Sequence, residues 1–319
     1  MRKTDKDADR KDVQKDNIAV KKVLVICGAT ATGKTAFAVK CAKMLESQVI
    51  SADSQLIYRH LNIGTAKPTA EEMEGVVHHM IDIVEPDASF SVSDYREKAL
   101  PIVEGLLSEG KVPVICGGTG FYINSLLFDL SYGSARGDEG IRAKYNEILR
   151  LNGKDYLYNL LKEVDEQSAL TIHPNDTKRV IRALEIYEVS GKRKSELNDG
   201  FTPKFDYIAV AINYPREELY ARIDERVDVM FESGLVDEVK SLLSQGIDEH
   251  CQSMQAIGYK EVIECLKNGD SQSTMRDIIK RNTRHYAKRQ ITFFKKLPNT
   301  IWLEKCDAVP EKIMELLND

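Results

Sequence analysis

Eight consecutive residues near the start of the chain have the types and spacing needed to hold a phosphate group. In the pattern G-x-x-x-x-G-K-[ST] the glycines let the backbone curl around an anion, and the next helix adds the positive end of its dipole. The lysine would reach a terminal phosphate, and the last hydroxyl would bind Mg²⁺. The pattern predicts a phosphate-binding loop, or P-loop. Its residues are Gly28, Ala29, Thr30, Ala31, Thr32, Gly33, Lys34 and Thr35.

A carboxylate that could act beside the bound phosphates is found after the second predicted strand. Enzymes that bind ATP in a P-loop need an acid at the end of a later apolar strand. Here the later strand VPVIC is followed by GGTG, with no acid. Asp53 instead follows the strand QVISA, and because carboxyl ends of parallel strands line one crevice, Asp53 should face the P-loop. This favours a base acting beside a diphosphate, although a role as helix cap or turn residue stays open.

These residues need a scaffold in which strands and helices alternate. Short apolar runs predict strands at residues 21–27, 48–52, 112–116, 207–212 and 301–303. Amphipathic spacing predicts helices at residues 35–45, 92–109 and 276–296, among others. This order is typical of an α/β fold, here a P-loop NTPase-like parallel sheet core. Residues 139–190 are charged and helical without a strand-like run, which predicts a helical insertion domain.

The predicted domain boundaries follow from this pattern. Residues 1–20 alternate in charge and lack large apolar side chains, which predicts a disordered tail. Residues 21–122 and 200–319 would form the catalytic core, and residues 123–199 would form the insertion.

The bulk properties exclude several classes of protein. The chain has 319 residues, with no apolar run near the roughly 20 residues that a membrane span needs and no secretory signal. The six cysteines lack zinc-site spacing and several lie in apolar runs, which predicts a reducing, cytoplasmic location. The net charge of −5 does not favour nucleic acid, so RNA would have to bind local basic patches.

One basic patch is found near the C-terminus. Residues 278–303 contain no acidic side chain, and Arg281, Arg284 and Lys288 fall on one helical face. This spacing suits contacts with RNA phosphates, whereas a solvated basic face is the alternative. Arg179 and Arg182 belong to a second basic cluster, where ion pairs with Glu185 or Glu188 are an equal possibility. His78 and His79 have no third partner at metal spacing and are interpreted as structural.

Further runs resemble the tRNA dimethylallyltransferase (tRNA isopentenyltransferase) family. In order, the matches extend from residue 23 to about residue 294. Each run alone is weak, but together they are highly specific. The absence of C-x-x-C, which the zinc finger of eukaryotic members contains, predicts the bacterial type. The runs are DSQLIYR (53–59), NIGTAKP (62–68), HHMID (78–82), GGTGFY (117–122), RVIRALE (179–185), RIDERVD (222–228), AIGY (256–259) and AKRQ (287–290).

The resemblance implies a reaction and a role for each catalytic residue. The family transfers a dimethylallyl group from dimethylallyl diphosphate to N6 of adenosine 37, just 3′ of the tRNA anticodon. The P-loop would then hold the prenyl diphosphate with Mg²⁺ through Lys34 and Thr35, and Asp53 would be the general base. Arg222 would neutralise the leaving diphosphate, and Thr119 would lie where tRNA and diphosphate meet.

The resemblance also implies contacts with the tRNA anticodon stem-loop. Most of them fall in the insertion or beside Asp53, and the basic patch adds three residues. Arg142 is assigned less directly, because the loop before it is one residue longer than in the family. Nothing in the pattern requires more than a monomer. The predicted tRNA-binding residues are Asp53, Ser54, Gln55, Leu56, Thr119, Arg142, Lys178, Arg179, Val180, Ile181, Arg182, Arg281, Arg284 and Lys288.

Three alternative functions remain at this point. An adenylate prenyltransferase would use the same diphosphate chemistry on free AMP or ATP, but would leave the insertion and the basic helix unexplained. A small-molecule kinase would bind ATP in the P-loop, which the missing acid after VPVIC argues against. A non-catalytic RNA-binding module would not depend on Asp53.

Overall fold

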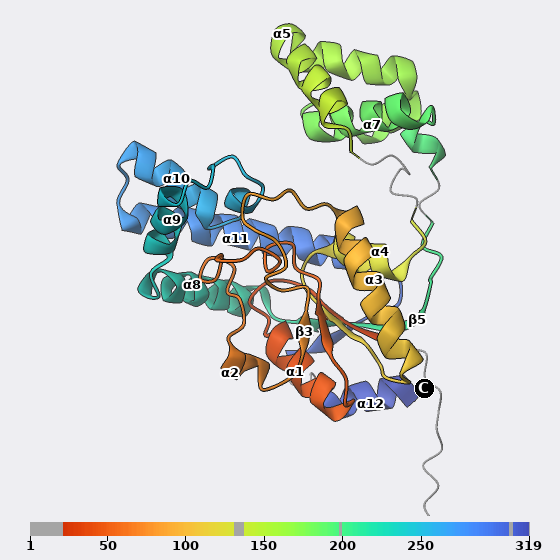
Figure 1. Cartoon of the computed structure of the whole chain (residues 1–319), viewed down its shortest axis with the longest axis vertical. Helices are drawn as coiled ribbons and strands as arrows, with labels where there is room; N and C mark the ends of the chain where they lie inside the picture. The colour runs from red at the N-terminus through yellow and green to blue at the C-terminus, as the bar shows by residue number, and fades with distance from the viewer. Residues whose placement is uncertain (1–21, 131–136, 198–199, 306–308, 319) are drawn as a thin grey trace, which may run out of the picture.

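The core of the protein is a single parallel sheet of six strands (Figure 1). The computed structural model describes residues 22–130, 137–197, 200–305 and 309–318, so the predicted tail lies outside the described residues. The strand order is β3-β2-β4-β1-β5-β6, and every pairing is parallel. This confirms the predicted α/β class. The strands are β1 (Lys22–Cys27), β2 (Val49–Ser51), β3 (His78–His79), β4 (Val114–Cys116), β5 (Asp206–Asn213) and β6 (Thr300–Glu304).

Helices cover both faces of the sheet because the central strands are apolar on both sides. In β1, Val23 and Val25 face one core and Leu24 faces the other. The first core is closed by α3, α4 and α8 to α11, and the second by α1 and α12. The core helices are α1 (Lys34–Met44), α2 (Ala70–Met73), α3 (Val92–Ser108), α4 (Gly120–Leu127), α8 (Arg216–Glu232), α9 (Leu235–Ser244), α10 (Tyr259–Asn268), α11 (Gln272–Phe294) and α12 (Pro310–Asn318).

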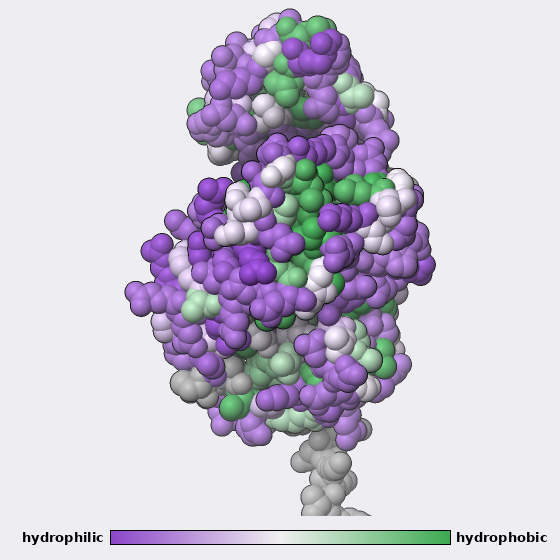
Figure 2. Space-filling view, turned by 90° about the vertical axis from the view of Figure 1, so that its left-hand side faces the viewer, coloured by the Kyte–Doolittle hydropathy of each residue, from purple (hydrophilic) through white to green (hydrophobic). Residues whose placement is uncertain are grey.

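The insertion is a helical lobe with its own small core. Helices α5 (Glu139–Val164), α6 (Glu166–Thr171) and α7 (Thr177–Ser190) bury Leu157 and Leu184 among themselves. Figure 1 shows this lobe at one end of the molecule, and Figure 2 shows a waist between it and the core. Residues 123–128, which were predicted to belong to the insertion, instead pack in the main core, because four of the six have large apolar side chains and all six are buried.

Two local features differ from the sequence expectation. Strand β3 has only two residues, both histidines, and its short polar sequence gave no strand pattern. Helix α11 begins at Gln272 rather than at residue 276, because the Ser271 hydroxyl caps it by accepting from the N–H of Thr274. In the described part of the chain, no helix is long and apolar enough to cross a membrane.

Candidate active site

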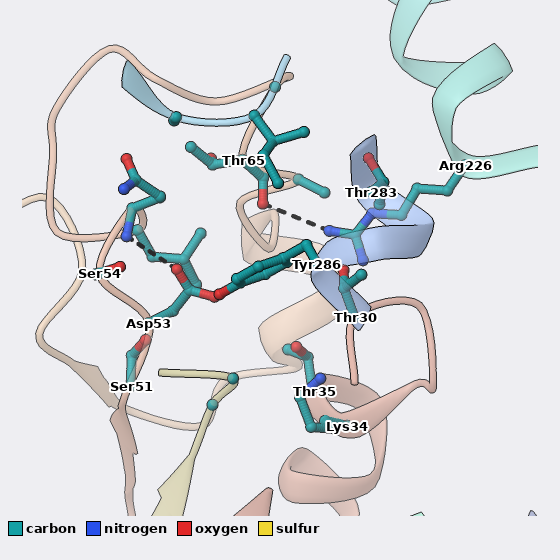
Figure 3. A pocket seen from close by; sticks show the side chains of 18 of the residues that line it. Thr30, Lys34, Thr35, Ser51, Asp53, Ser54, Thr65, Arg226, Thr283 and Tyr286 are labelled. Atoms are coloured by element: carbon teal, nitrogen blue, oxygen red, sulfur yellow. Dashed lines mark hydrogen bonds between the residues drawn. The ribbon is translucent and has the colours of Figure 1, made fainter. Parts of the chain in front are cut away.

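A cavity of about 370 Å³ opens at the carboxyl ends of β1, β2 and β4. The P-loop, Asp53 and the residues after β4 all line it, as predicted from the order of the strands. Its other walls come from α8, α11 and the loop before α2 (Figure 3). The cavity therefore combines an anion-binding loop, a carboxylate and two helices that are distant in sequence.

The P-loop has the strained backbone that a phosphate cradle requires. Gly28 and Gly33 have φ angles of 123° and 80°, and Ala31 is also left-handed at 62°. The Thr32 hydroxyl donates a hydrogen bond to the carbonyl oxygen of Ala29 at 2.9 Å, and the Lys34 ammonium donates to the same oxygen. Burial lowers the pKa of Lys34, with a further decrease from the charge of Arg226. An anion in the loop would offset this cost of burying the ammonium group.

Asp53 is fixed by the loop that follows β2. Its Oδ1 accepts a hydrogen bond from the N–H of Gln55 at 2.9 Å. The neighbouring N–H of Ser54 donates to the Thr119 hydroxyl oxygen at 3.0 Å, which brings two of the predicted catalytic residues together. Figure 3 shows the Tyr286 ring extending from α11 towards Asp53. Burial and, next, the Asp53 charge raise the pKa of Tyr286, so this phenol stays protonated beside the carboxylate.

Arg222 and Arg226, the two arginines of the run RIDERVD, occupy different places. Arg222 donates from Nε to the carbonyl oxygen of Ala31 at 2.8 Å and lies 4.9 Å from the centroid of the Tyr214 ring, but it is not among the residues that line the cavity. Arg226, one turn later, does line the cavity, and its Nη2 lies 3.5 Å from the carbonyl oxygen of Thr65. Burial lowers the pKa of Arg226. In this structure Arg226 lines the cavity, whereas Arg222, the arginine predicted to neutralise the diphosphate, contacts the backbone of the P-loop.

One wall of the cavity is apolar. It includes Ile223, Val227 and Met230 from α8 and Ile279 from α11. Ile81 and Ile257 come from two loops. Such a wall can bind a short hydrocarbon group next to the charged end of the cavity.

The side chains near the P-loop suit a hard divalent cation that also binds phosphate oxygens. Thr35 and Asp53 contribute oxygen atoms to the cavity. Ser51 is 4% exposed, lines the same cavity, and its Oγ has no hydrogen-bond partner among the described residues. Oxygen ligands of this kind suit Mg²⁺. In the described ranges no three His, Cys, Asp or Glu side chains form a cluster that could hold a metal ion.

The residues predicted to contact tRNA lie in three places: at the cavity, in the insertion and on α11. Ser54, Gln55 and Leu56 lie beside Asp53 at the cavity. In the insertion, Val180 and Ile181 are 1% and 6% exposed, so these apolar side chains pack in the lobe core instead of reaching the surface. Among the predicted cations, Arg284 is paired with Asp224 at 2.7 Å. Lys178, Arg281 and Lys288 lie exposed on their helices, and the remaining three, Arg142, Arg179 and Arg182, form ion pairs.

The ion pairs left open by the sequence are settled in part. Arg182 pairs with Glu185 at 2.5 Å, but Arg179 pairs with Asp176 at 3.2 Å. Arg142 reaches the same Glu185 at 2.8 Å. His78 and His79 are hydrogen-bonded to Val76 and Gln48, but His78 also lines the cavity, and its buried Nε2 has no hydrogen-bond partner among the described residues.

The Glu185 carboxylate is the anchor of the insertion. Its side chain is fully buried and accepts from Arg182, from Arg142 and from the N–H of Asp138. Burial raises its pKa, but hydrogen bonds from Arg182 and Asp138 outweigh this effect and bring the pKa below the ordinary 4.5. A carboxyl whose pKa is lower in the folded state than in the unfolded state stabilises the protein at any pH above its unfolded-state pKa. This contribution is lost as the pH falls through the folded-state pKa.

Glu185→Gln should therefore destabilise the lobe at neutral pH, by about 2 kcal/mol, because buried donors lose a charged acceptor. As the pH falls below the ordinary carboxyl pKa of 4.5, the difference from the unsubstituted protein should shrink, since Glu185 becomes protonated as the pH passes its lowered folded-state pKa. Hydrogen exchange of α7 measures this directly. Glu188→Gln, on the same helix but more exposed, is the matched control. If α7 exchanged equally slowly in Glu185→Gln and in the unsubstituted protein at pH 7, Glu185 would not stabilise the insertion.

Glu238 holds the loop that carries Thr65. Its carboxylate accepts from the N–H groups of Asn62, Ile63 and Gly64 at 2.9 to 3.2 Å and from the Tyr259 hydroxyl at 2.5 Å. No larger residue fits at the position of Gly64, because an added Cβ would lie 2.4 Å from the Tyr259 ring. This carboxylate therefore sets the position of the cavity wall that faces Arg226.

Glu238→Gln should lower the free energy of unfolding by about 2 kcal/mol, because an amide has one acceptor oxygen and no charge for these donors. Urea denaturation measures the loss. Asp237→Asn, at an exposed position in the same helical turn, should cost no more than about 0.5 kcal/mol. Similar losses in both variants would show that only the charge of the helix end matters.

The fold and the site define a P-loop enzyme of the α/β class that lacks an acid after β4 and has a carboxylate after β2. Comparisons with known proteins agree on its family. Residues 56–297 match the family described as IPP transferase. This chain belongs to the IPP transferase family, which confirms the resemblance seen in the sequence.

Individual relatives are similar over nearly the whole chain. The tRNA dimethylallyltransferase of Acetivibrio thermocellus is 45% identical over 286 residues, which cover 89% of this chain and 91% of that protein. The tRNA isopentenylpyrophosphate transferase structure from Bacillus halodurans is 41% identical, with 93% and 95% coverage and a TM-score of 0.69. A eukaryotic dimethylallyltransferase acting on tRNA is 30% identical, with 89% and 74% coverage and a TM-score of 0.75.

Proposed function

We propose that this enzyme prenylates tRNA by transferring a dimethylallyl group from dimethylallyl diphosphate to N6 of adenosine 37. The relatives are tRNA dimethylallyltransferases, so prenyl transfer to tRNA is the activity of the family. The observation that supports the detailed reaction is a shared cavity. The P-loop, the Asp53 carboxylate and an apolar wall all face it.

The charged end of the cavity suits the diphosphate. P-loop N–H groups and Lys34 would bind its oxygens, and Arg226 would bind them from the opposite side. Arg222 supports this arrangement from outside, since it holds the Ala31 carbonyl. When bound, Mg²⁺ at Thr35, with Ser51 nearby, would neutralise charge on the diphosphate oxygens. The apolar wall would hold the five-carbon group.

Asp53 is suited to accept the proton released from adenine. The exocyclic amine is a poor nucleophile because its lone pair is delocalised into the ring. In the reaction the bond between C1 of the prenyl group and the diphosphate oxygen breaks, and a bond forms between C1 and N6. The electron pair leaves with the diphosphate, and the N6 proton passes to Asp53. Thr119 would keep the Asp53 loop in place through Ser54.

The tRNA would bind across the lobe and α11. Adenosine 37 must leave its stack to enter the cavity, and a loop nucleotide is cheaper to extrude than a paired one. Exposed cations at Lys178, Arg281 and Lys288 would bind the anticodon stem-loop backbone. The proposal takes a monomer as the active unit.

A label-transfer assay tests the proposal. Purified protein, Mg²⁺ and labelled dimethylallyl diphosphate are mixed with unmodified tRNA, with AMP, or with a tRNA in which adenosine 37 is replaced by guanosine. Label in the unmodified tRNA alone is the expected result. Label in AMP alone would identify an adenylate prenyltransferase. ATP consumption without label transfer would identify a kinase.

A further inference from the structure

The side-chain amide of Gln290 joins the P-loop to the loop after β4. Gln290 belongs to α11 and is 5% exposed. Its Oε1 accepts a hydrogen bond from the N–H of Thr30 at 2.8 Å, and its Nε2 donates to the carbonyl oxygen of Gly118 at 3.0 Å. Both functions of the amide are satisfied by backbone groups of different loops, so the side chain fixes the distance between them.

The second loop leaves room for this contact only because residue 118 is a glycine. A Cβ added to Gly118 would lie 2.2 Å from the Gln290 Nε2. The next residue, Thr119, donates its N–H to the carbonyl oxygen of Ala52 at 3.0 Å, and its hydroxyl accepts from the N–H of Ser54 beside Asp53. Gln290 is therefore connected through hydrogen bonds both to the P-loop and to the proposed base.

Helix α11 presents two different faces. Ile279, Thr283, Tyr286 and Gln290 recur at helical spacing and line the cavity. Arg281 and Lys288 lie on the exposed side of the same helix, where RNA phosphates are proposed to bind. Because a helix moves as a rigid rod over these few turns, a restraint on one face restrains the other.

We infer that Gln290 is a positioning residue that couples RNA binding on α11 to diphosphate binding in the P-loop. The inference rests on the proposed function. RNA on the exposed face restrains α11, and the Gln290 hydrogen bonds pass this restraint to Thr30 and Gly118. The loop then loses less conformational freedom when the diphosphate binds. Coupling is reciprocal, so the diphosphate tightens RNA binding by the same factor.

The test compares the affinity for inorganic diphosphate with Mg²⁺ in the presence and absence of an anticodon stem-loop RNA. In the unsubstituted protein, saturating RNA should lower the Kd by about tenfold. In Gln290→Met, which keeps the size of the side chain and removes both hydrogen bonds, the factor should fall to about one. Isothermal calorimetry gives both constants, and the coupling factor is a readout that loss of stability alone does not change.

Two further variants keep the test decisive. Gly118→Ala displaces the Gln290 amide without altering it, so it should also abolish the coupling, and it decides the question where Gln290→Met fails to fold. Thr292→Ala, at an exposed position of the same helix, should retain the full factor. Full coupling in Gln290→Met or Gly118→Ala overturns the inference, as does an unsubstituted enzyme that prenylates tRNA without coupling. Absence of prenyl transfer in the unsubstituted enzyme instead overturns the proposed function.

Discussion

Asp53→Asn should reduce the turnover of prenyl transfer to tRNA by about 10²- to 10⁴-fold, because an amide cannot take the N6 proton. The substitution changes little else. The amide that replaces the carboxylate keeps an oxygen for the N–H of Gln55, so the loop after β2 should hold its shape. The affinity for tRNA should therefore stay within about threefold, since phosphate contacts dominate it. Single-turnover transfer of labelled prenyl group and a filter-binding assay separate the two quantities.

Asp87→Asn is the control for the loss of one negative charge. Asp87 is an exposed loop residue that does not line the cavity, and its substitution should change turnover by no more than about twofold. If Asp53→Asn retained normal turnover, the carboxylate would be a turn residue and the base would have to be sought elsewhere. If both turnover and tRNA binding disappeared together, Asp53 would serve the fold of its loop more than the chemistry.

Some parts of this site could be predicted from the sequence because their information is local. The P-loop pattern occupies eight adjacent positions, and a buried strand precedes it in the structure as expected. Asp53 could be placed because parallel strands end at one edge of the sheet, whatever the exact register. The insertion could be recognised because a long stretch without strand patterning must find its own core, and α5 to α7 have one.

Other parts depend on packing that no local pattern records. Tyr286 and Gln290 line the cavity only because α11 lies against it, and the sequence marked that helix by its charges and by the run AKRQ, neither of which shows which side faces the cavity. Val180 and Ile181 belong to a run that resembles a tRNA-binding segment, although their apolar character is that of the buried side of an amphipathic helix. The helical spacing of apolar residues could have predicted this, because it places Val180 and Ile181 on the buried face of the helix and Lys178 on the exposed face.

Which of Arg222 and Arg226 lines the cavity also depends on packing that the sequence does not show. The two are four residues apart, so they lie on one side of α8 and the sequence cannot tell which one reaches the ligand. The position of the helix separates them in this structure: Arg222 donates to the Ala31 carbonyl oxygen of the P-loop, and Arg226 lines the cavity. The half-buried Arg226 guanidinium makes one long contact, to the carbonyl oxygen of Thr65, and has further donors that an anion can take.

Arg226→Gln should lower kcat by about 10²- to 10³-fold, because it removes a preorganised charge from the place where the leaving diphosphate gains charge. The Michaelis constant for dimethylallyl diphosphate should rise as well, since the ground state carries much of the same charge. Arg222→Gln is the matched variant. It removes a support of the Ala31 carbonyl rather than a ligand of the diphosphate, so its effect should be about tenfold or less.

Steady-state kinetics with varied dimethylallyl diphosphate at saturating tRNA distinguishes the two arginines. A guanidinium that acts on the diphosphate should affect prenyl transfer and product diphosphate inhibition together, so Arg226→Gln should also weaken inhibition by added diphosphate. Arg222→Gln should leave that inhibition nearly intact. The opposite order of the two effects would mean that α8 turns or shifts when the substrate binds and brings Arg222 into the cavity. The position of Arg226 beside Thr65, held through Glu238 on α9, argues against such a rearrangement.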